Sequence, residues 1–158
     1  IGSFGASSVL IYGVIQSPLA QPRNLVGGHL VSALTGVTIA QILPDIVWLT
    51  APFAVSLSVI AMQHTKTLHP PGGATALIAV TGSAKIKALG YLYVVFPVLT
   101  GVIILLLVAL IVNNMTSHRK YPTDGRFSRN FKWITDPISQ QSQKIKEKRI
   151  NLTTRNNK

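Results

Sequence analysis

The sequence predicts an all-α polytopic membrane protein with three full transmembrane helices and two shorter, broken half-helices. Only 12% of its 158 residues are charged, about half the usual share in a soluble domain. Residues 1–112 carry four basic residues and one acid, whereas residues 113–158 carry eleven basic residues and three acids. We therefore expect a transmembrane domain over residues 1–115 and a basic, largely disordered cytosolic tail over residues 116–158.

Three uncharged runs are long enough to cross a bilayer, because a hydrocarbon core of about 30 Å needs about 20 apolar residues per helix. The runs are residues 25–43, 46–65 and 90–112. Trp48 lies near the start of the second run, and Tyr91 and Tyr93 lie at the start of the third. Aromatic residues favour the membrane surface, so we expect these three side chains there.

Two further apolar runs, residues 4–15 and 73–82, are only about half a spanning length. They resemble each other, since Gly5-Ala6-Ser7 aligns with Gly73-Ala74-Thr75. Short segments within internal repeats are typical of many transporters. The pattern predicts an inverted repeat of long helix, half-helix and long helix, whose first helix would precede Ile1. A chance match over so few residues is the alternative.

Small residues follow one another at four-residue spacing in the first full span, at Gly28, Ser32, Gly36 and Ala40. This spacing places them on one helix face, where the backbone of another helix can approach closely. We assign packing and no chemistry to this stripe.

The segment His69–Ala76 holds two prolines followed by two glycines. The prolines are expected to forbid a regular helix and the glycines to permit a sharp turn, so that a half-helix begins at about Ala74. The first N–H groups of such a helix face the turn with the positive end of the dipole, which suits an anion. A kinked helix with a structural turn is the alternative.

Polar side chains inside spans are costly and often functional, which draws attention to His29, His64 and His69. A proton relay or a structural hydrogen bond is favoured over a metal site, because the chain has no cysteine and its embedded part has only Asp45 as an acid. No metal or cofactor is expected. The candidate anion-binding residues are Gly5, Ala6, Ser7, Arg23, His29, His69, Pro70, Pro71, Gly72, Gly73, Ala74 and Thr75.

Loop charges leave two topologies open. If the half-helices cross the membrane, Arg23 and Lys66 share a side with the tail, and Asp45, Lys85 and Lys87 lie opposite. If they re-enter, the four basic loop residues share one side and the tail lies on the other. Cytoplasmic loops are rich in Lys and Arg, which favours the first arrangement and a cytosolic tail.

The run from Leu68 to Leu77, LHPPGGATAL, resembles the signature of the HPP family of integral membrane proteins. The run from Ser17 to Asn24, followed by Gly27-Gly28-His29, resembles its second hallmark, and the resemblance covers about residues 1–122. Plastid members are associated with nitrite transport and bacterial members are inferred to be similar. The resemblance implies a further helix before Ile1 and transport of a small anion. Arg23 would then attract anions, hold a loop or anchor the membrane surface.

We expect a transporter or channel for a small inorganic anion such as nitrite. The alternative is a non-transporting membrane anchor or sensory module that recruits a partner through its basic tail. An enzyme is not expected, because no nucleophile, base and acid occur together. Nucleic-acid binding is not expected either, since the net charge of +11 is concentrated beside the membrane. The expected partners are the lipid bilayer, a small inorganic anion and further copies of the chain. The expected location is a bacterial inner membrane, with a plastid membrane less favoured.

Overall fold

The computed structural model describes residues 2–116, 118–123, 140–141, 144–145, 147–148 and 150. The chain divides into two units, Ile1–Leu106 and Leu107–Lys158, which are treated separately below. Most of the predicted basic tail, residues 116–158, lies outside the described residues, so its disorder stays a prediction.

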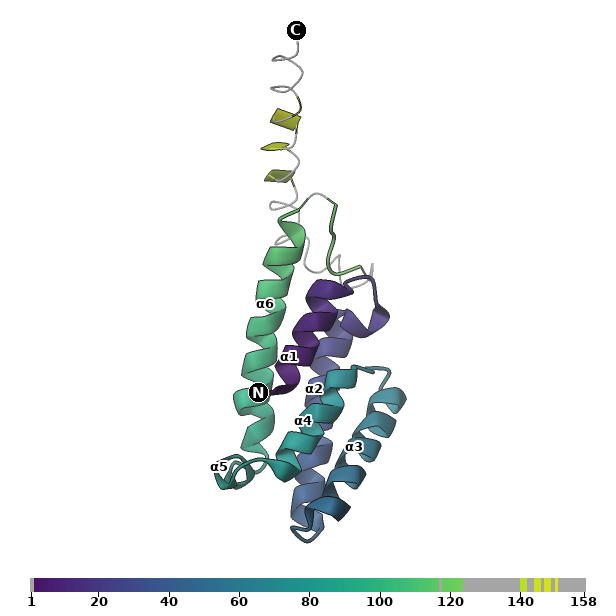
Figure 1. The fold of residues 1–158 in the computed structure, drawn as a ribbon, viewed down its shortest axis with the longest axis vertical. Helices are drawn as coiled ribbons and strands as arrows, with labels where there is room; N and C mark the ends of the chain where they lie inside the picture. Colours follow the sequence, from purple (N-terminus) through teal and green to yellow (C-terminus); the bar gives the residue numbers. More distant parts are fainter. Residues whose placement is uncertain are drawn as a thin grey trace. The chain divides into compact units, whose positions relative to one another are not determined.

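The described chain is built of helices, and an all-α polytopic membrane fold is confirmed (Figure 1). In order these are α1 (Gly2–Ser8), π-helix η1 (Val9–Gly13), 3-10 helix η2 (Pro18–Ala20), α2 (Pro22–Ile42), α3 (Val47–His64), α4 (Pro70–Thr81), α5 (Ala84–Ala88), π-helix η3 (Val94–Leu99) and α6 (Thr100–Asn114). Three segments have the length and apolar composition to cross a membrane, as predicted: Pro22–Ile42, Val47–His64 and Val94–Asn114. The two short segments are α1 with η1, and α4.

The α4 half-helix begins earlier than predicted. His69 is its N-cap in an extended conformation, and Pro70 and Pro71 occupy its first turn. Proline is tolerated there, because the first N–H groups of a helix have no partner within the helix. Gly72 N already donates to His69 O at 2.8 Å, so the glycines lie inside the helix and form no turn before it. The predicted start at Ala74 is therefore wrong.

Apart from Met62, the buried face of the α3 helix is polar or small, and its exposed face is apolar. Its buried residues follow a four-residue spacing and are Thr50, Ala54, Ser58 and Met62. Its large exposed side chains are Val47, Trp48, Phe53, Leu57 and Ile60. Lipid solvates the apolar face, while small residues let neighbouring helices come close. This distribution is typical of a helix that borders lipid.

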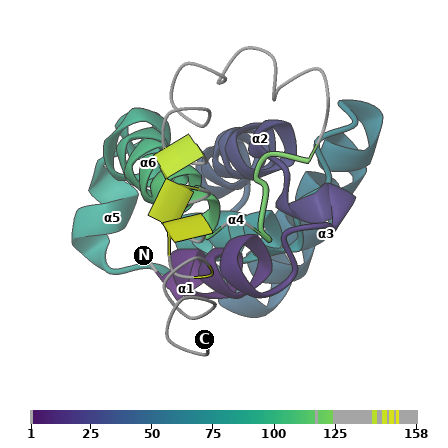
Figure 2. The same cartoon turned by 90° about the horizontal axis from the view of Figure 1, so that it is seen from above.

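The small-residue stripe of α2 packs against α4, as predicted. A Cβ atom added at Gly28 would lie 2.5 Å from His69 Cβ, and one at Gly36 would lie 2.7 Å from Ala76 Cα. The α4 helix thus lies between α1, α2 and α3 in the centre of unit 1 (Figure 2). The absence of side chains on the two glycines sets this distance between helices.

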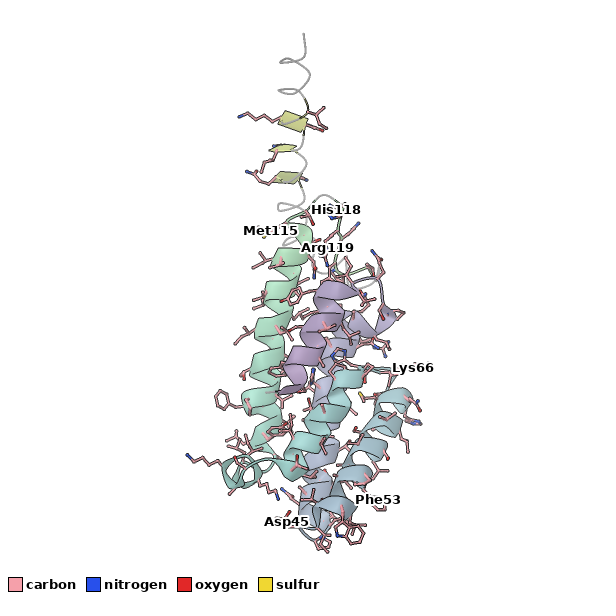
Figure 3. The ribbon with its side chains drawn as sticks, viewed as in Figure 1. Asp45, Phe53, Lys66, Met115, His118 and Arg119 are labelled. Atoms are coloured by element: carbon pink, nitrogen blue, oxygen red, sulfur yellow. The ribbon has the colours of Figure 1, made fainter. Side chains whose placement is uncertain are left out.

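The half-helix α4 runs from the Lys66 end of α3 toward its Asp45 end (Figure 1). Lys66 and Asp45 lie at opposite ends of α3 (Figure 3). After α4 the chain returns to the Asp45 end, where Lys87 Nζ lies 2.5 Å from Asp45 Oδ1. The α1 helix runs the other way, because it leads to the segment whose Leu19 carbonyl bonds His69 near the Lys66 end. The two half-helices are therefore antiparallel (Figure 1), while the crossing topology stays a prediction.

Unit 2 contains the end of α6 and the segment that follows it. Asn114 Nδ2 donates to Leu110 O at 2.7 Å and to Tyr121 O at 2.6 Å, and Asn114 Oδ1 accepts from Tyr121 N at 3.2 Å. Tyr121 is fully buried. One amide side chain therefore closes the end of the helix and fixes the segment after it.

We expect Gly36→Ala to lower the free energy of unfolding by about 1–3 kcal/mol, because the new methyl group overlaps the Ala76 backbone and forces α2 and α4 apart. The matched change Gly5→Ala meets nothing within 4 Å and should be neutral or stabilise by about 0.5–1 kcal/mol. Thermal unfolding of the detergent-solubilised variants measures both. Equal melting temperatures for the two variants would contradict the proposed packing.

Candidate functional site

Five polar side chains are buried together where α1, α2 and the start of α4 meet. They are Ser3, Ser7, His29, His69 and Thr75, and each is at most 1% exposed. We call them the histidine cluster. Burial of polar groups in a membrane protein is costly unless they are hydrogen-bonded, so their partners decide what the cluster can do.

Ser7 joins the two histidines. Its Oγ lies 2.7 Å from His29 Nε2 and 2.9 Å from His69 Nε2. The imidazole centroids are 5.0 Å apart and the rings are tilted by 58°. One hydroxyl, with one proton and two lone pairs, therefore bridges two imidazoles.

Thr75 extends the cluster on the other side of His29. Its Oγ1 lies 2.7 Å from His29 Nδ1 and 2.9 Å from Ser3 Oγ. Tyr93 Oη donates to the Thr75 carbonyl at 3.1 Å. These contacts join α1, α2, α4 and the residue preceding η3 through one threonine.

Helix packing explains why the two histidines can meet. Gly28 leaves room for the His69 side chain, since a Cβ atom at position 28 would lie 2.5 Å from His69 Cβ. His69 Nδ1 donates to Leu19 O at 2.8 Å, which fixes the ring orientation. Phe4 contacts His29 edge-on with centroids 5.3 Å apart, and its ring lies over Gly101, where a Cβ atom would lie 2.2 Å from it. The cluster is held rigidly from several sides.

A cavity of about 140 Å³ opens at the Asp45 end of unit 1. Since a water molecule occupies about 30 Å³ in the liquid, it has room for a small ion with part of its hydration shell. Its lining includes Gln41, Asp45, Thr50, Lys87, Gly90 and Tyr93. Tyr93 is 1% exposed and belongs both to this lining and to the contacts of Thr75. Tyr93 therefore contacts both the cavity and the histidine cluster.

The structure brings four of the twelve candidate residues into the cluster, namely Ser7, His29, His69 and Thr75. Beside them, Pro71, Gly72 and Gly73 are buried, Ala74 is half-buried and Pro70 is exposed. Gly5 and Ala6 lie on the exposed face of α1, on the side away from the cluster. The first turn of α4 offers few free N–H groups, because two of its residues are prolines and Gly72 is already bonded. The donors come from side chains instead.

Arg23 lies outside the cluster and is exposed. Its Nη2 donates to Thr65 O at 3.3 Å, and the neighbouring Asn24 Nδ2 donates to Leu68 O at 2.7 Å. Both contacts hold the segment between α3 and α4. Of the three roles weighed for Arg23, the geometry fits the one that holds a loop.

Sequence reasoning did not select Ser3, Phe4, Leu19 or Tyr93 for the site. Ser3 lies one helical turn before Ser7, which is the signal that could have identified it. The placement of Tyr93 at the membrane surface is wrong, because the side chain is buried against Thr75, whereas Tyr91 is exposed and lies 3.1 Å from Thr38. Within the described residues, no group of three His, Cys, Asp or Glu side chains could hold a metal ion.

The family comparison agrees with this arrangement. The family model for the HPP transmembrane region matches residues 1–122, which contain every residue of the cluster. This chain belongs to the HPP family. Two transmembrane proteins of Dictyostelium discoideum are similar to it, at 51% identity over 128 residues and 50% over 125 residues. Each match covers 77% of this chain but only 44% and 40% of the relatives, so the chain spans less than half of their length. No solved structure matches.

Ser7→Ala should lower the free energy of unfolding of this HPP protein by about 1–3 kcal/mol, because both imidazoles lose a buried hydrogen-bond partner. Ser8→Ala is the matched control, since Ser8 Oγ donates only locally, to Phe4 O at 2.9 Å. Thermal unfolding in detergent compares the two. A Ser8→Ala variant as unstable as Ser7→Ala would show that Ser7 holds no special position.

Proposed function

We propose that this HPP protein is a transporter or channel for a small inorganic anion, with nitrite as the first substrate to test. The observation that carries the proposal is the histidine cluster, in which hydroxyl and imidazole groups are buried inside a bundle whose outer face is apolar. Such groups are expensive in a membrane and mark substrate or ion pathways. Neutral donors of this kind can bind an anion and also release it.

The directions of the half-helices support the same proposal. The α1 and α4 helices run antiparallel, and Ser3 and Ser7 of α1 bond to Thr75 and His69 at the start of α4. Transporters with inverted repeats place their sites where broken helices meet near the centre of the membrane. We propose an inverted repeat in which α1 and α2 belong to the first unit and α3, α4 and α6 form the second.

The cavity supplies an approach to the cluster. Lys87 lines the cavity and contributes a positively charged ammonium group, and its side chain is 31% exposed. Its ion pair with Asp45 neutralises part of this charge. Gln41 and Thr50 add uncharged polar groups to the lining. An anion would be attracted by Lys87, lose water in the cavity and reach the cluster when Tyr93 moves away from Thr75.

Other features of the proposal follow from sequence. We propose that the protein is not an enzyme, that its C-terminus is cytosolic and that further copies of the chain can associate with it. A bacterial inner membrane remains the proposed location, while the two relatives come from a eukaryote.

Thr75→Val tests the proposed function directly. We expect the initial rate of nitrite uptake into proteoliposomes to fall about tenfold, because a lost buried hydrogen bond costs about 1–3 kcal/mol and about 1.4 kcal/mol is a factor of ten. Thr81→Val is the control, since the exposed Thr81 bonds only Leu77 O. Absence of nitrite flux in the unsubstituted protein under every gradient would reject the proposal.

The variants Lys87→Gln and Asp45→Asn test whether the charges of the cavity attract the anion. We expect a higher KM for nitrite in the first variant and a lower KM in the second, because one removes the cation and the other removes the acid that neutralises it. Both effects should shrink in concentrated salt, which screens exposed charges. Folding should change little, since exposed ion pairs are worth about 0–1 kcal/mol. A shift of KM in the same direction in both variants would contradict this role.

A further inference from the structure

The side-chain hydrogen bonds of the histidine cluster follow one another in a chain, and Ser7 Oγ has one further contact, to the Ser3 carbonyl at 3.3 Å. In order, the chain joins Ser3 Oγ, Thr75 Oγ1, the two nitrogens of His29, Ser7 Oγ and the two nitrogens of His69, and it ends on the Leu19 carbonyl. Each successive pair of atoms is 2.7 to 2.9 Å apart. These are good hydrogen-bond distances throughout.

The Leu19 carbonyl decides the direction of the bonds when both rings are neutral. A carbonyl only accepts, so His69 Nδ1 carries a proton and His69 Nε2 accepts from Ser7. The Ser7 oxygen then accepts from His29 Nε2–H. His29 Nδ1 consequently accepts from Thr75, whose single hydroxyl proton is then used. From Thr75 to His69, every proton points toward Leu19. The Thr75–Ser3 geometry has Thr75 as the donor, which belongs to the opposite order.

One added proton reverses this order and keeps the bonds from Thr75 to Leu19. A proton that arrives on Thr75 Oγ1 releases the original Thr75 proton to His29 Nδ1, and each group passes its own proton to the next until His69 carries protons on both nitrogens. His69 Nε2 then donates to Ser7, Ser7 to His29, His29 to Thr75, and Thr75 to Ser3. The added charge is held as the His69 imidazolium, and no atom other than hydrogen has to move far.

The chain runs between the two ends of unit 1. Its Ser3 and Thr75 end lies beside Tyr93, which lines the cavity at the Asp45 end. Its His69 end bonds Leu19 in the segment before α2, which lies with Arg23 and Asn24 toward the Lys66 end. The hydrogen-bonded chain therefore extends from the cavity side of unit 1 toward the Lys66 side, which is the direction of the proposed transport path.

Other titratable groups lie on the elements packed around the chain. Tyr93 bonds the Thr75 carbonyl, Tyr12 lies on η1, and Arg23 lies near the start of α2. His64 and Lys66 are exposed at the end of α3, and Lys85 and Lys87 are on α5, beside Asp45. The side-chain bonds of the chain join two imidazoles and three hydroxyls, whereas Tyr93 bonds the Thr75 backbone carbonyl.

We propose that this chain of Ser3, Thr75, His29, Ser7 and His69 conducts and stores the coupling proton, so that the protein moves one proton together with one anion. The inference rests on the proposed transport function and names its second substrate. An imidazolium at His69 would also attract the anion, and a proton and a monovalent anion together carry no net charge. Release of the proton toward the Lys66 end requires the His69–Leu19 bond to open, which gives the chain a step that a transport cycle can control.

The first experiment measures stoichiometry in the full chain reconstituted in phosphatidylethanolamine–phosphatidylglycerol vesicles containing pyranine. Initial uptake of ¹⁵N-nitrite is measured with an inside-alkaline pH gradient, and separately with a potassium diffusion potential set by valinomycin. We expect uptake to follow the pH gradient, to ignore the potential and to acidify the lumen by about one proton per nitrite. Protein-free vesicles correct for nitrous acid that crosses the lipid unaided.

The second experiment uses His29→Gln and His69→Gln. A glutamine amide can replace hydrogen bonds but cannot pass on a proton. We expect pH-driven uptake and luminal acidification to fall to the protein-free level. Exchange of labelled for unlabelled nitrite at equal pH should fall less, because the imidazoles also belong to the proposed anion site but exchange needs no proton transfer. The control His64→Gln changes an exposed histidine outside the chain and should retain both activities. Gel-filtration profiles in detergent identify the variants that fold.

The outcomes separate the two proposals. No nitrite exchange or uptake by the unsubstituted protein rejects transport itself. Exchange with no dependence on the pH gradient and no acidification leaves transport standing and overturns proton coupling. Equal loss of exchange and pH-driven uptake in folded His29→Gln also overturns it, because the imidazole would then serve anion binding alone. If neither variant folds, uptake in D₂O decides: coupled uptake should slow while exchange does not, and equal rates in both solvents overturn the inference.

Discussion

The close approach of α4 to α2 is the constraint on which the rest of unit 1 depends. Gly28 and Gly36 remove the side chains that would separate the helices, and the space left at Gly28 is occupied by His69. That placement lets His69 share Ser7 with His29. Hydrogen bonds between buried neutral groups are individually modest, but the cost of leaving one unpaired in a membrane is larger. The close packing of α4 on α2 therefore positions the hydrogen bonds, and the hydrogen bonds in turn stabilise the packing.

The two prolines and two glycines of α4 acquire a physical role from this packing. Pro70 and Pro71 allow the helix to begin at once after an extended residue, which turns the His69 side chain toward α1 and α2. Gly72 passes within contact distance of Ser32, Met62 and the Gly28 carbonyl. The segment therefore lets the first turn of α4 pack closely against its neighbouring helices. The polar groups of the site are the His69 imidazole at the start of this segment and the Ser7 hydroxyl to which it is hydrogen-bonded.

The polar groups of unit 1 fall into two environments with different physics. Lys87 and Asp45 are partly solvated, so their effect is electrostatic, long in range and reduced by salt. The histidine cluster is buried and tightly hydrogen-bonded, so its effect depends on distances of a few tenths of an ångström. Tyr93 lies between them and contacts both. On the proposed transport path, an anion would leave the charged environment of Lys87 and enter the hydrogen-bonded cluster at Tyr93.

The sequence by itself determined the membrane fold, the three spans, the small-residue stripe and four members of the cluster, because hydrophobic length, residue size and the cost of buried polarity are local properties. It could not place Tyr93 in the interior or the start of α4 at Pro70. An aromatic residue at a span end and a proline pair each permit two positions, and only neighbouring helices choose between them. It also could not show that Ser3, Leu19 and Gly101 belong to one site. Their contacts join residues distant in the chain, and only the tertiary structure brings such residues together.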